Sequence, residues 1–276
     1  MMRVLVTGAA GMLGRDLVPR LAAEHEVLAV DLDVDVTDPR AVDGCVDAFG
    51  PDAVFHLAAW TDVDRAESEE EAAHAVNAGG TRNVARAAAR AGAALVVPST
   101  DYVFDGTKGA PYVEDDAPAP LGAYGRTKLA GERAAVEEHP AGTRIARTAW
   151  LYGRHGRNFV DTMLRLAADR DEVAVVDDQE GSPTWTCDLV PALVALLRCP
   201  PGVYHTAGGG SVTWAGFAEA IFAEAGLSCR VRRVTSAELG RPAPRPALSA
   251  LAVTRPGAPR LRPWREALVD YLEEVR

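Results

Sequence analysis

The sequence predicts an α/β protein with a doubly wound parallel sheet and a smaller C-terminal lobe. Three observations lead to this prediction. Short runs rich in Val, Leu and Ile alternate with Ala-rich amphipathic segments through the first half of the chain. Strands this apolar are typical of a parallel sheet that helices cover on both faces. A glycine-rich turn joins the first strand to the first helix, and the alternation loosens after residue 150.

The first half supplies five expected strands and the helices between them. The strands are expected at residues 3–8, 26–31, 52–59, 94–99 and 143–150. The clearest amphipathic helices are expected at 13–24 and 69–92. Right-handed crossovers between parallel strands place such helices on both faces of one sheet.

The second half predicts a less regular part of the molecule. A helix, a strand that runs into a polar loop, and a further helix are expected at 158–171, 172–184 and 187–199, respectively. A strand and a glycine turn then lead into a helix with Thr213 as its N-cap and Gly226 as its C-terminal stop. Residues 240–263, rich in Pro and Arg, are expected to form an irregular loop before a final amphipathic helix.

Composition and charge restrict the class of protein. Hydrophobic residues make up 48% and charged residues 25% of the 276 residues, as in ordinary globular proteins. The net charge of −10 argues against a nucleic-acid-binding protein, which needs a basic face, although backbone amides can still hold a nucleotide locally. No apolar run is long enough to span a membrane and no signal peptide pattern is present, so we expect a cytoplasmic location.

The residues that commonly bind metals show no ligand pattern. The cysteines at positions 45, 187, 199 and 229 form no CxxC pair, and the histidines lack ligand spacing. The run of Asp177, Asp178 and Gln179 is more typical of a solvated loop than of a metal site. We therefore expect no disulfide framework and no metal.

The segment VTGAAGMLG is the first candidate site. It places Gly8, Gly11 and Gly14 between the first strand and the first helix. Glycines there allow a tight turn and let backbone amides approach a pyrophosphate, which the helix dipole also favours. The second strand ends at Asp31, about 20 residues on, where a carboxylate binds the ribose hydroxyls of a dinucleotide. Together these features predict a dinucleotide site, although three glycines alone are as typical of a plain turn.

Asp31 also bears on the choice of dinucleotide. Its carboxylate repels the 2′-phosphate of NADPH, and no Arg or Lys follows it directly in DLDVDVTD. The sequence therefore favours NADH. NADPH stays open as well, because Arg15 or Arg40 can fold over a phosphate.

A tyrosine and a lysine form the second candidate site. Tyr124 and Lys128 are four residues apart in AYGRTKLAGE and share one face of a helix. A nearby ammonium group lowers the pKa of a tyrosine from its ordinary value near 10, which prepares the phenol for general acid catalysis on a carbonyl. Thr100, at the end of ALVVPST, can add a hydroxyl that holds the substrate oxygen. A YxxxK pair alone also occurs by chance on surface helices.

Six motifs in chain order resemble those of the extended short-chain dehydrogenase/reductases and, within them, the dTDP-4-dehydrorhamnose reductase family. They are TGAAGMLG, HLAAWTDVDRAE, STDYVFDG, YGRTK, RTAWLYG and VVDDQEGSPT. STDYVFDG and DDQEGSPT are far more specific than YxxxK. The resemblance implies reduction of the C4 ketone of a dTDP-4-keto-6-deoxy-L-hexose by NADPH or NADH. It also implies an NAD(P)-binding Rossmann domain at 1–150, to which 184–206 return, and a substrate-binding lobe at 151–183 and 207–276.

The resemblance assigns the site residues as well. It implies that Tyr124 protonates the nascent C4 alkoxide, that Lys128 holds the nicotinamide ribose and lowers the pKa of Tyr124, and that Thr100 hydrogen-bonds the reacting oxygen. Further cofactor contacts are implied for Gly8, Gly11, Met12, Leu13, Gly14, Asp31, Asp35, Val36, Leu57, Ala58, Ala59 and Thr61. Further substrate contacts are implied for Thr61, Val63, Asp101, Tyr102, Trp150, Asn158, Gln179 and Arg245.

The chain departs from the family pattern at two places. The family segment RPxNSxL is RPALSAL here, so Leu248 replaces a polar residue, and Trp60 stands where a smaller or different aromatic residue is common. Some family members dimerise through magnesium held by acidic residues, but the chain shows no matching acidic set. The expected state is a monomer or a homodimer without metal.

Several residues also fit a purely structural role. Trp150 is as typical of a core aromatic at a strand end as of a binding residue, and His56 is typical of a packing residue. The glycines at 208–210 lack a following acid at ribose spacing and predict a flexible turn. The acidic run at 67–73 is expected to begin a helix, whose dipole it favours.

Two other functions fit the same motifs. One is a related ketoreductase that makes a different deoxysugar, for instance in secondary metabolism. The other is a non-catalytic NADP-binding regulatory subunit, like the beta subunit of methionine adenosyltransferase, which shares this fold family. The intact set of Thr100, Tyr124 and Lys128 favours an enzyme.

Overall fold

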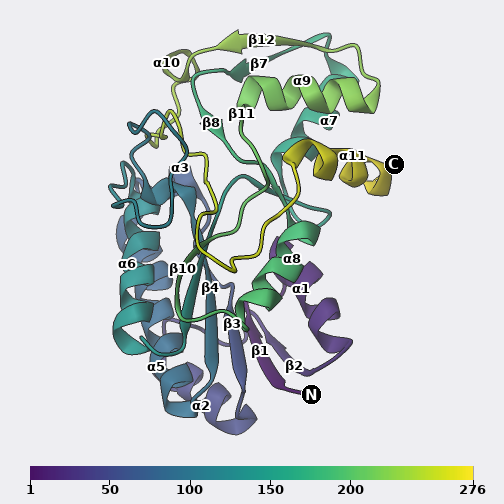
Figure 1. Ribbon diagram of the computed structural model, residues 1–276. Helices are drawn as coiled ribbons and strands as arrows, with labels where there is room; N and C mark the ends of the chain where they lie inside the picture. The colour runs from purple at the N-terminus through teal and green to yellow at the C-terminus, as the bar shows by residue number, and fades with distance from the viewer. Residues whose placement is uncertain (276) are drawn as a thin grey trace.

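Six parallel strands form the central sheet of the computed structural model, which describes residues 1–275 (Figure 1). Their spatial order is β10-β5-β4-β3-β1-β2. Their bounds are β1 Arg3–Thr7, β2 Glu26–Val30, β3 Ala53–His56, β4 Ala94–Thr100, β5 Thr143–Thr148 and β10 Gly202–His205. Every neighbouring pair in this sheet is parallel, which confirms the fold class that the apolar strands predict.

Helices cover both faces of the sheet because strand side chains alternate between the two faces. One face carries α1 and α8, and the other carries α2, α5 and α6 (Figure 1), with bounds Met12–Ala22, Thr186–Leu196, Pro39–Phe49, Thr81–Ala91 and Ala123–Glu138 in that order. In β1, Val4 and Val6 are buried with α1 and α8, whereas Leu5 is buried with α2 and α5. None of the helices in residues 1–275 has both the length and the apolar character that a membrane crossing requires.

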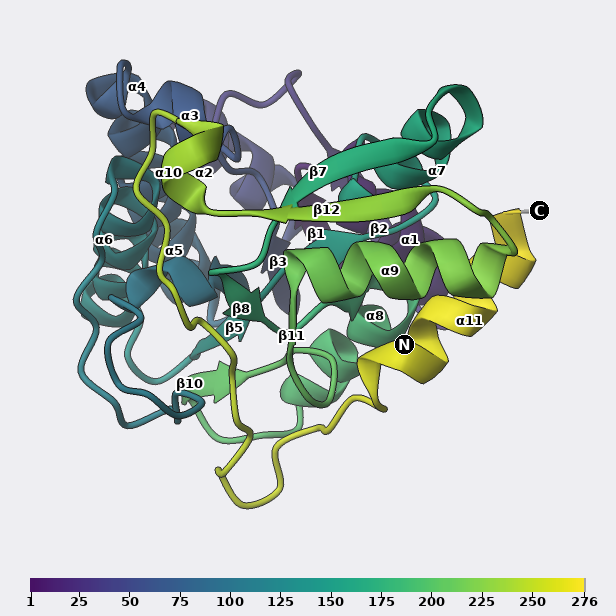
Figure 2. The ribbon, with the colours of Figure 1, turned by 90° about the horizontal axis from the view of Figure 1, so that it is seen from above.

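The rest of the chain forms a lobe above the carboxyl ends of the sheet strands (Figure 1). Figure 2 shows β7, β12 and α9 lying across the top of the molecule. The lobe contains a parallel pair of strands and three helices, which are β7 Glu172–Val176, β12 Arg230–Val234, α7 Phe159–Asp169, α9 Trp214–Ala225 and α11 Trp264–Val275. Its core is aromatic, with Tyr152, Phe217 and Tyr271 fully buried in one cluster.

Short elements lie beside the sheet strands or within the lobe. They are α3 Val63–Ala66, α4 Glu70–His74, a 3-10 turn Asp101–Val103, β6 Leu151–Tyr152, β8 Glu180–Gly181, β9 Thr184–Trp185, β11 Val212–Thr213 and α10 Ser236–Leu239. The segment 240–263 is largely irregular, as expected, and bridges back to the body of the protein through the pairs Tyr112–Leu251 and Glu180–Leu248. The C-terminal segment therefore returns to the carboxyl ends of the sheet strands, near the end of β4.

Local signals placed several helix ends correctly. The hydroxyl of Thr213 accepts a hydrogen bond from the amide of Gly216 at 3.1 Å, which confirms the predicted N-cap of α9. Gly226 ends the same helix in the left-handed conformation with φ +69°, as glycine allows. Glu70 and Glu71 begin α4 as expected, whereas Glu67 lies just after α3.

Other elements differ from the expectation. Helix α2 was not expected, although Asp38 caps it and proline follows at its first position. The single helix expected at 69–92 is α4, a π-helical segment Ala75–Gly80 and α5. Strand β12 was missed because arginines occupy most of its positions. The strand expected to run into a polar loop within 172–184 is β7, which ends at Val176 as that expectation allows.

A buried ion pair supports the sheet beneath the strand ends. The Arg147 guanidinium donates to both carboxylate oxygens of Glu132, at 3.0 and 2.7 Å, and their side chains are only 4% and 6% exposed. The guanidinium also lies 5.2 Å over the centre of the Phe104 ring. Two charges buried this deeply require each other, because either one alone faces a large desolvation cost.

We expect Glu132→Ala to lower the free energy of unfolding by about 3–5 kcal/mol, because it leaves the Arg147 charge buried without a counter-charge. Urea unfolding measures the change. Glu137→Ala is the control, since the pair of Glu137 with Arg82 is exposed at 66% and 45%. Similar losses for both variants would contradict the role of the buried pair.

Candidate functional site

The glycine turn between β1 and α1 is shaped by close backbone contacts. Gly8 has φ +67°, and a Cβ atom there would stand 2.5 Å from the backbone nitrogen of Ala58. A Cβ atom on Gly14 would stand 2.5 Å from the carbonyl oxygen of Ala9. Both positions therefore require glycine, and Ala58, at the end of β3, lies directly against the turn.

The first turn of α1 has no side-chain cap. Gly11 is its N-cap residue, and α1 begins with Met12 and Leu13. Amides at a helix start without a capping side chain suit an anion such as a pyrophosphate. The carboxylate of Asp31 accepts a hydrogen bond from the amide of Ala10 at 2.8 Å, so the predicted ribose-binding acid lies against the same turn. The turn thus fits the predicted dinucleotide.

The other predicted cofactor residues follow β2 and β3. The carboxylate of Asp35 accepts hydrogen bonds from the hydroxyl and amide of Thr37, which lower the pKa of Asp35. Val36 is buried, and a Cβ atom on Gly80 would stand 2.8 Å from it. Leu57, Ala58 and Ala59 follow β3 directly. All of these residues therefore gather at the carboxyl ends of neighbouring strands, where open α/β sheets bind ligands.

Strand β4 and helix α6 bring the predicted catalytic residues together. The Lys128 ammonium donates to the carbonyl oxygen of Pro98 at 2.9 Å, two residues before Thr100. Thr100 ends β4; its hydroxyl accepts from the amide of Tyr102 at 3.1 Å and lies near the Tyr124 phenol, whose pKa it lowers. The rings of Tyr102 and Tyr124 meet edge to face with their centres 6.0 Å apart.

Burial controls the charge of these groups. It raises the pKa of Tyr124 to about 12, with the nearby Asp101 carboxylate adding to the rise and Thr100 opposing it. Burial also lowers the pKa of Lys128 to about 8, against the effect of Glu132. The expectation that Lys128 lowers the pKa of Tyr124 below its ordinary value is therefore wrong for this structure, because desolvation of the phenol prevails and the ammonium binds a backbone carbonyl. At neutral pH Tyr124 keeps its proton and Lys128 its charge.

Asp101 connects β4 to the C-terminal segment. Its buried carboxylate accepts hydrogen bonds from the hydroxyl of Ser249 at 2.5 Å and from the hydroxyl of Thr100 at 3.1 Å. Burial raises the pKa of Asp101 to about 7, although both hydrogen bonds oppose the rise. Ser249 was not among the site residues predicted from the sequence. The available signal was its place in RPALSAL, beside the departure at Leu248.

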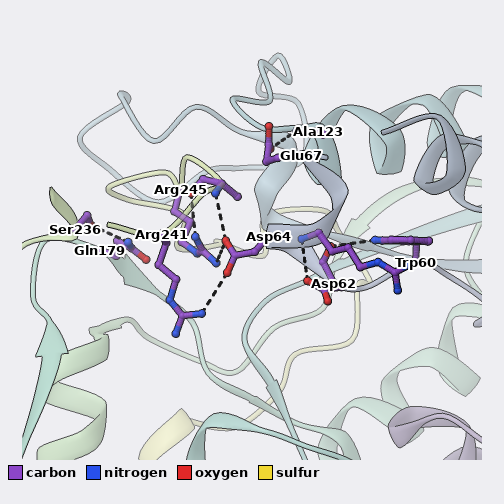
Figure 3. Close-up of polar contacts among 11 residues, drawn as sticks. Trp60, Asp62, Asp64, Glu67, Ala123, Gln179, Ser236, Arg241 and Arg245 are labelled. Atoms are coloured by element: carbon purple, nitrogen blue, oxygen red, sulfur yellow. Dashed lines mark hydrogen bonds and ion pairs between the residues drawn. The ribbon is translucent and has the colours of Figure 1, made fainter. Parts of the chain in front are cut away.

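Asp64 ties helix α3 to the same C-terminal segment. Figure 3 shows its carboxylate between Arg241 and Arg245, whose guanidinium groups donate to it at 3.2 and 3.0 Å. The amide of Ala243 donates to it as well, at 3.2 Å. Arg245 also lies near the Tyr102 phenol, where its charge opposes the rise in pKa that burial causes. Two cations therefore share one carboxylate at the junction of the sheet domain and the lobe.

Two hollows adjoin at this junction, since Pro244 lines both. The larger has a volume of about 240 Å³, and its polar lining includes Gln179, Ser236, Arg241 and Arg245. The amide of Gln179 donates to the Ser236 hydroxyl at 2.8 Å. The narrower hollow is lined by Val63, Glu67, Tyr102, Tyr124 and Pro246, among others. Four predicted substrate residues therefore line these hollows: Val63 and Tyr102 the narrower one, and Gln179 and Arg245 the larger one.

Three predicted substrate residues are placed differently. Trp150 has φ +48° and stacks on Trp214 with the ring centres 3.5 Å apart. Asn158 caps α7: its side chain accepts from the amide of Asp161 and donates to the carbonyl of Gly153. Thr61 is exposed just before α3. In the part of the chain that the structure describes, none of the three lines either hollow.

His56 and the acidic pair at 177–178 were expected to have structural rather than catalytic roles. His56 is buried between the hydroxyls of Thr7 and Thr81, at 2.8 and 3.2 Å, and burial lowers its pKa to about 3, which confirms a packing role. Asp177 is half-buried and Asp178 is exposed, as expected for a solvated loop, and both accept hydrogen bonds from lobe residues, including Arg233 and Ser236.

The glycine run at 208–210 packs closely against the lobe. A Cβ atom on Gly208 would stand 2.1 Å from the carbonyl oxygen of Pro183, and the amide of Gly208 donates to the Thr184 hydroxyl at 3.0 Å. The turn therefore serves close backbone packing.

Comparisons with known proteins agree over the whole chain. A family model described as the RmlD substrate binding domain matches residues 2–276. The dTDP-4-dehydrorhamnose reductase of Streptomyces griseus is 48% identical over 97% of this chain and 92% of its own. The dTDP-4-keto-6-deoxy-D-glucose reductase of Streptomyces niveus is 46% identical over 97% of this chain and 96% of its own. A crystal structure of dTDP-4-dehydrorhamnose reductase from Bacillus anthracis in complex with NADP matches with a TM-score of 0.96 and 40% identity, over 99% of both chains.

We expect Ser249→Ala to destabilise the protein by about 1–3 kcal/mol, because Asp101 loses a buried hydrogen-bond donor. Burial already raises the pKa of Asp101 in the folded protein to about 7. The free energy of unfolding therefore falls as the pH rises from the pKa of Asp101 in the unfolded chain toward about 7. Losing the donor raises the pKa in the folded protein further. The loss measured by urea unfolding should therefore be larger at about pH 8.5 than at about pH 5. An equal loss at both pH values would show that the serine does not stabilise the charged carboxylate.

Proposed function

Because this chain belongs to the RmlD substrate binding domain family, we propose that it reduces the C4 ketone of dTDP-4-dehydro-L-rhamnose to give dTDP-L-rhamnose, with NADPH or NADH as the reductant. One observation of the structure carries the proposal. A phenol that keeps its proton at neutral pH, Tyr124, lies near Thr100 at the carboxyl end of β4 and lines the narrower hollow.

The residues around the glycine turn would hold the cofactor. The uncapped amides of α1 suit its pyrophosphate, and Asp31 suits the adenosine ribose. Asp35, Val36 and the residues 57–59 would line the adenosine and nicotinamide sides, and Lys128 would bind the nicotinamide ribose. When bound, the reduced nicotinamide supplies the hydride for C4.

The chain itself supplies the proton. Tyr124, whose pKa is about 12, holds its proton at neutral pH and can deliver it from its phenol oxygen to the C4 alkoxide, which is the stronger base. The Thr100 hydroxyl would hold the reacting oxygen in line with the phenol. The Lys128 ammonium, with a pKa of about 8, keeps its charge at neutral pH and would hold the nicotinamide ribose on the same helix as the phenol.

We further propose that the lobe, residues 151–183 and 207–276, binds the nucleotide sugar, and that residues 1–150 with 184–206 form the cofactor domain. Arg241 and Arg245 line the larger hollow and suit a diphosphate. Val63, Asp101 and Tyr102 lie nearer Tyr124 and would contact the sugar. Gln179, on the wall of the larger hollow, remains a proposed substrate contact, whereas Thr61, Trp150 and Asn158 line neither hollow and are less well supported as contacts.

A second nucleotide sugar is favoured by one observation. The S. niveus relative, which is named as acting on a dTDP-4-keto-6-deoxy-D-glucose, is nearly as similar as the S. griseus one. Leu248, which replaces a polar family residue, lies on the segment beside Ser249. A panel of dTDP-4-keto-6-deoxy sugars, with NMR of each product, separates the two by the configuration at C3 and C5 of the sugar that is reduced and at C4 of the product. Turnover of none of the panel would overturn the proposed function.

We expect Tyr124→Phe to lower kcat roughly 100-fold or more, because it removes the acid that protonates the alkoxide. Cofactor affinity, measured by the fluorescence of NADPH on binding, should stay unchanged. Unchanged turnover in this variant would exclude Tyr124 as the acid.

We expect Asp31→Ala to shift cofactor preference toward NADPH. The carboxylate stands against the turn at Ala10, and Arg15 donates to the carbonyl of the same residue at 3.1 Å. Removing the carboxylate leaves a cation beside the 2′-phosphate, so the ratio of kcat/KM for NADPH to that for NADH should rise roughly tenfold, the factor that about 1.4 kcal/mol produces. Arg15→Ala should move the ratio the other way, and an unchanged ratio in both would contradict this reasoning.

A further inference from the structure

We propose that Glu67 positions the catalytic helix α6 by capping its N-terminus, an inference that rests on the proposed role of Tyr124. Helix α6 begins at Ala123, one residue before Tyr124. Its N-cap residue is Gly122, which offers no side chain to the first-turn amides. Glu67 supplies the missing acceptor from the end of α3: its Oε1 accepts a hydrogen bond from the amide of Ala123 at 2.7 Å (Figure 3).

The glycine at position 122 and the carboxylate of Glu67 depend on each other. Gly122 has φ −107°, which any residue adopts, so its backbone does not require glycine. A Cβ atom there would stand 2.7 Å from Oε1 of Glu67, but 3.4 Å from its next neighbour, the carbonyl oxygen of Pro244. The glycine therefore makes room for the remote carboxylate, which replaces a local capping side chain.

The cap lies close to Tyr124, so a small movement of the first turn of α6 also moves the catalytic phenol. Glu67 and Tyr124 line the same narrow hollow, together with Tyr102. A Cβ atom on Gly125 would stand 2.1 Å from the carbonyl oxygen of Tyr102, so the first turn of α6 is pressed against the segment that follows Thr100. The carboxylate also opposes the positive end of the helix. Without it the first turn can fray, and misplacement of the phenol by about 1 Å costs up to roughly 100-fold in rate.

Four variants test this role. Glu67→Ala removes the cap. Glu67→Gln keeps an oxygen that accepts the Ala123 hydrogen bond but carries no charge. Glu67→Ala combined with Gly122→Ser places a hydroxyl at the N-cap, in the space that the carboxylate leaves. Glu71→Ala, at an exposed glutamate of α4, is the control. Hydrogen–deuterium exchange of residues 122–126 reports the cap, and kcat and KM for the sugar substrate and the cofactor report the chemistry.

Glu67→Ala should speed exchange in residues 122–126 and lower kcat roughly tenfold or more, with KM for the cofactor unchanged. Glu67→Gln and the double variant should recover most of kcat and slow the exchange again, and Glu71→Ala should match the wild-type protein. Unchanged exchange in Glu67→Ala overturns the cap, whether or not the sugar is turned over. Faster exchange with unchanged kcat overturns the positioning role, and a loss in Glu67→Gln equal to that in Glu67→Ala shows that Glu67 acts through its charge instead. Failure of the wild-type protein to reduce any sugar counts against the proposed function, and the exchange result then decides the cap by itself.

Discussion

Burial of the carboxyl end of β4 is the constraint on which the site depends. The segment that carries Ser249 crosses the sheet where Thr100 and Asp101 leave it, and the serine hydroxyl closes over the Asp101 carboxylate. Because water is excluded there, the charged form of each group becomes more costly. Burial raises the pKa of Asp101, against the effect of Ser249, and it raises that of Tyr124 and lowers that of Lys128. The phenol therefore keeps its proton until a stronger base, such as an alkoxide, lies beside it.

One face of α6 carries the groups that make this burial tolerable. Tyr124, Lys128 and Glu132 follow each other at intervals of four residues and so share that face. Glu132 raises the pKa of Lys128 and also pairs with Arg147 on β5. The acid, the cation and the counter-charge thus sit on one rigid helix, so a change in the direction of α6 would move all three together. This is why the first turn of α6, held by residues from α3 and from the segment after β4, matters to the chemistry.

The sequence predicted what local patterns determine and missed what distant contacts determine. The glycine turn, the Tyr124–Lys128 spacing and the cap at Thr213 each depend on a few adjacent residues, and apolar runs were enough to predict a parallel sheet. Ser249 and Asp101 are 148 residues apart in the sequence, and Asp64 and Arg245 are 181 residues apart, so no periodicity connects either pair. Strand β12 carries the charge pattern of a surface segment and forms only because β7 offers it an edge. The pKa of Tyr124 was misjudged for the same reason: spacing reveals a neighbouring charge but not the depth of burial.

Local charge explains how a chain with a net charge of −10 can suit an anionic substrate. Interactions between exposed charges fade over roughly 8–10 Å in salt, so acidic residues elsewhere on the surface have little influence on the charges that line the larger hollow. There Arg241 and Arg245 share the single carboxylate of Asp64, which leaves the hollow with an excess of positive charge. A diphosphate entering the hollow would meet that excess, while Asp64 keeps the arginines in place before it arrives. The carboxylate therefore need not oppose the proposed substrate, because holding both guanidinium groups in advance lowers the entropic cost of ordering them on binding.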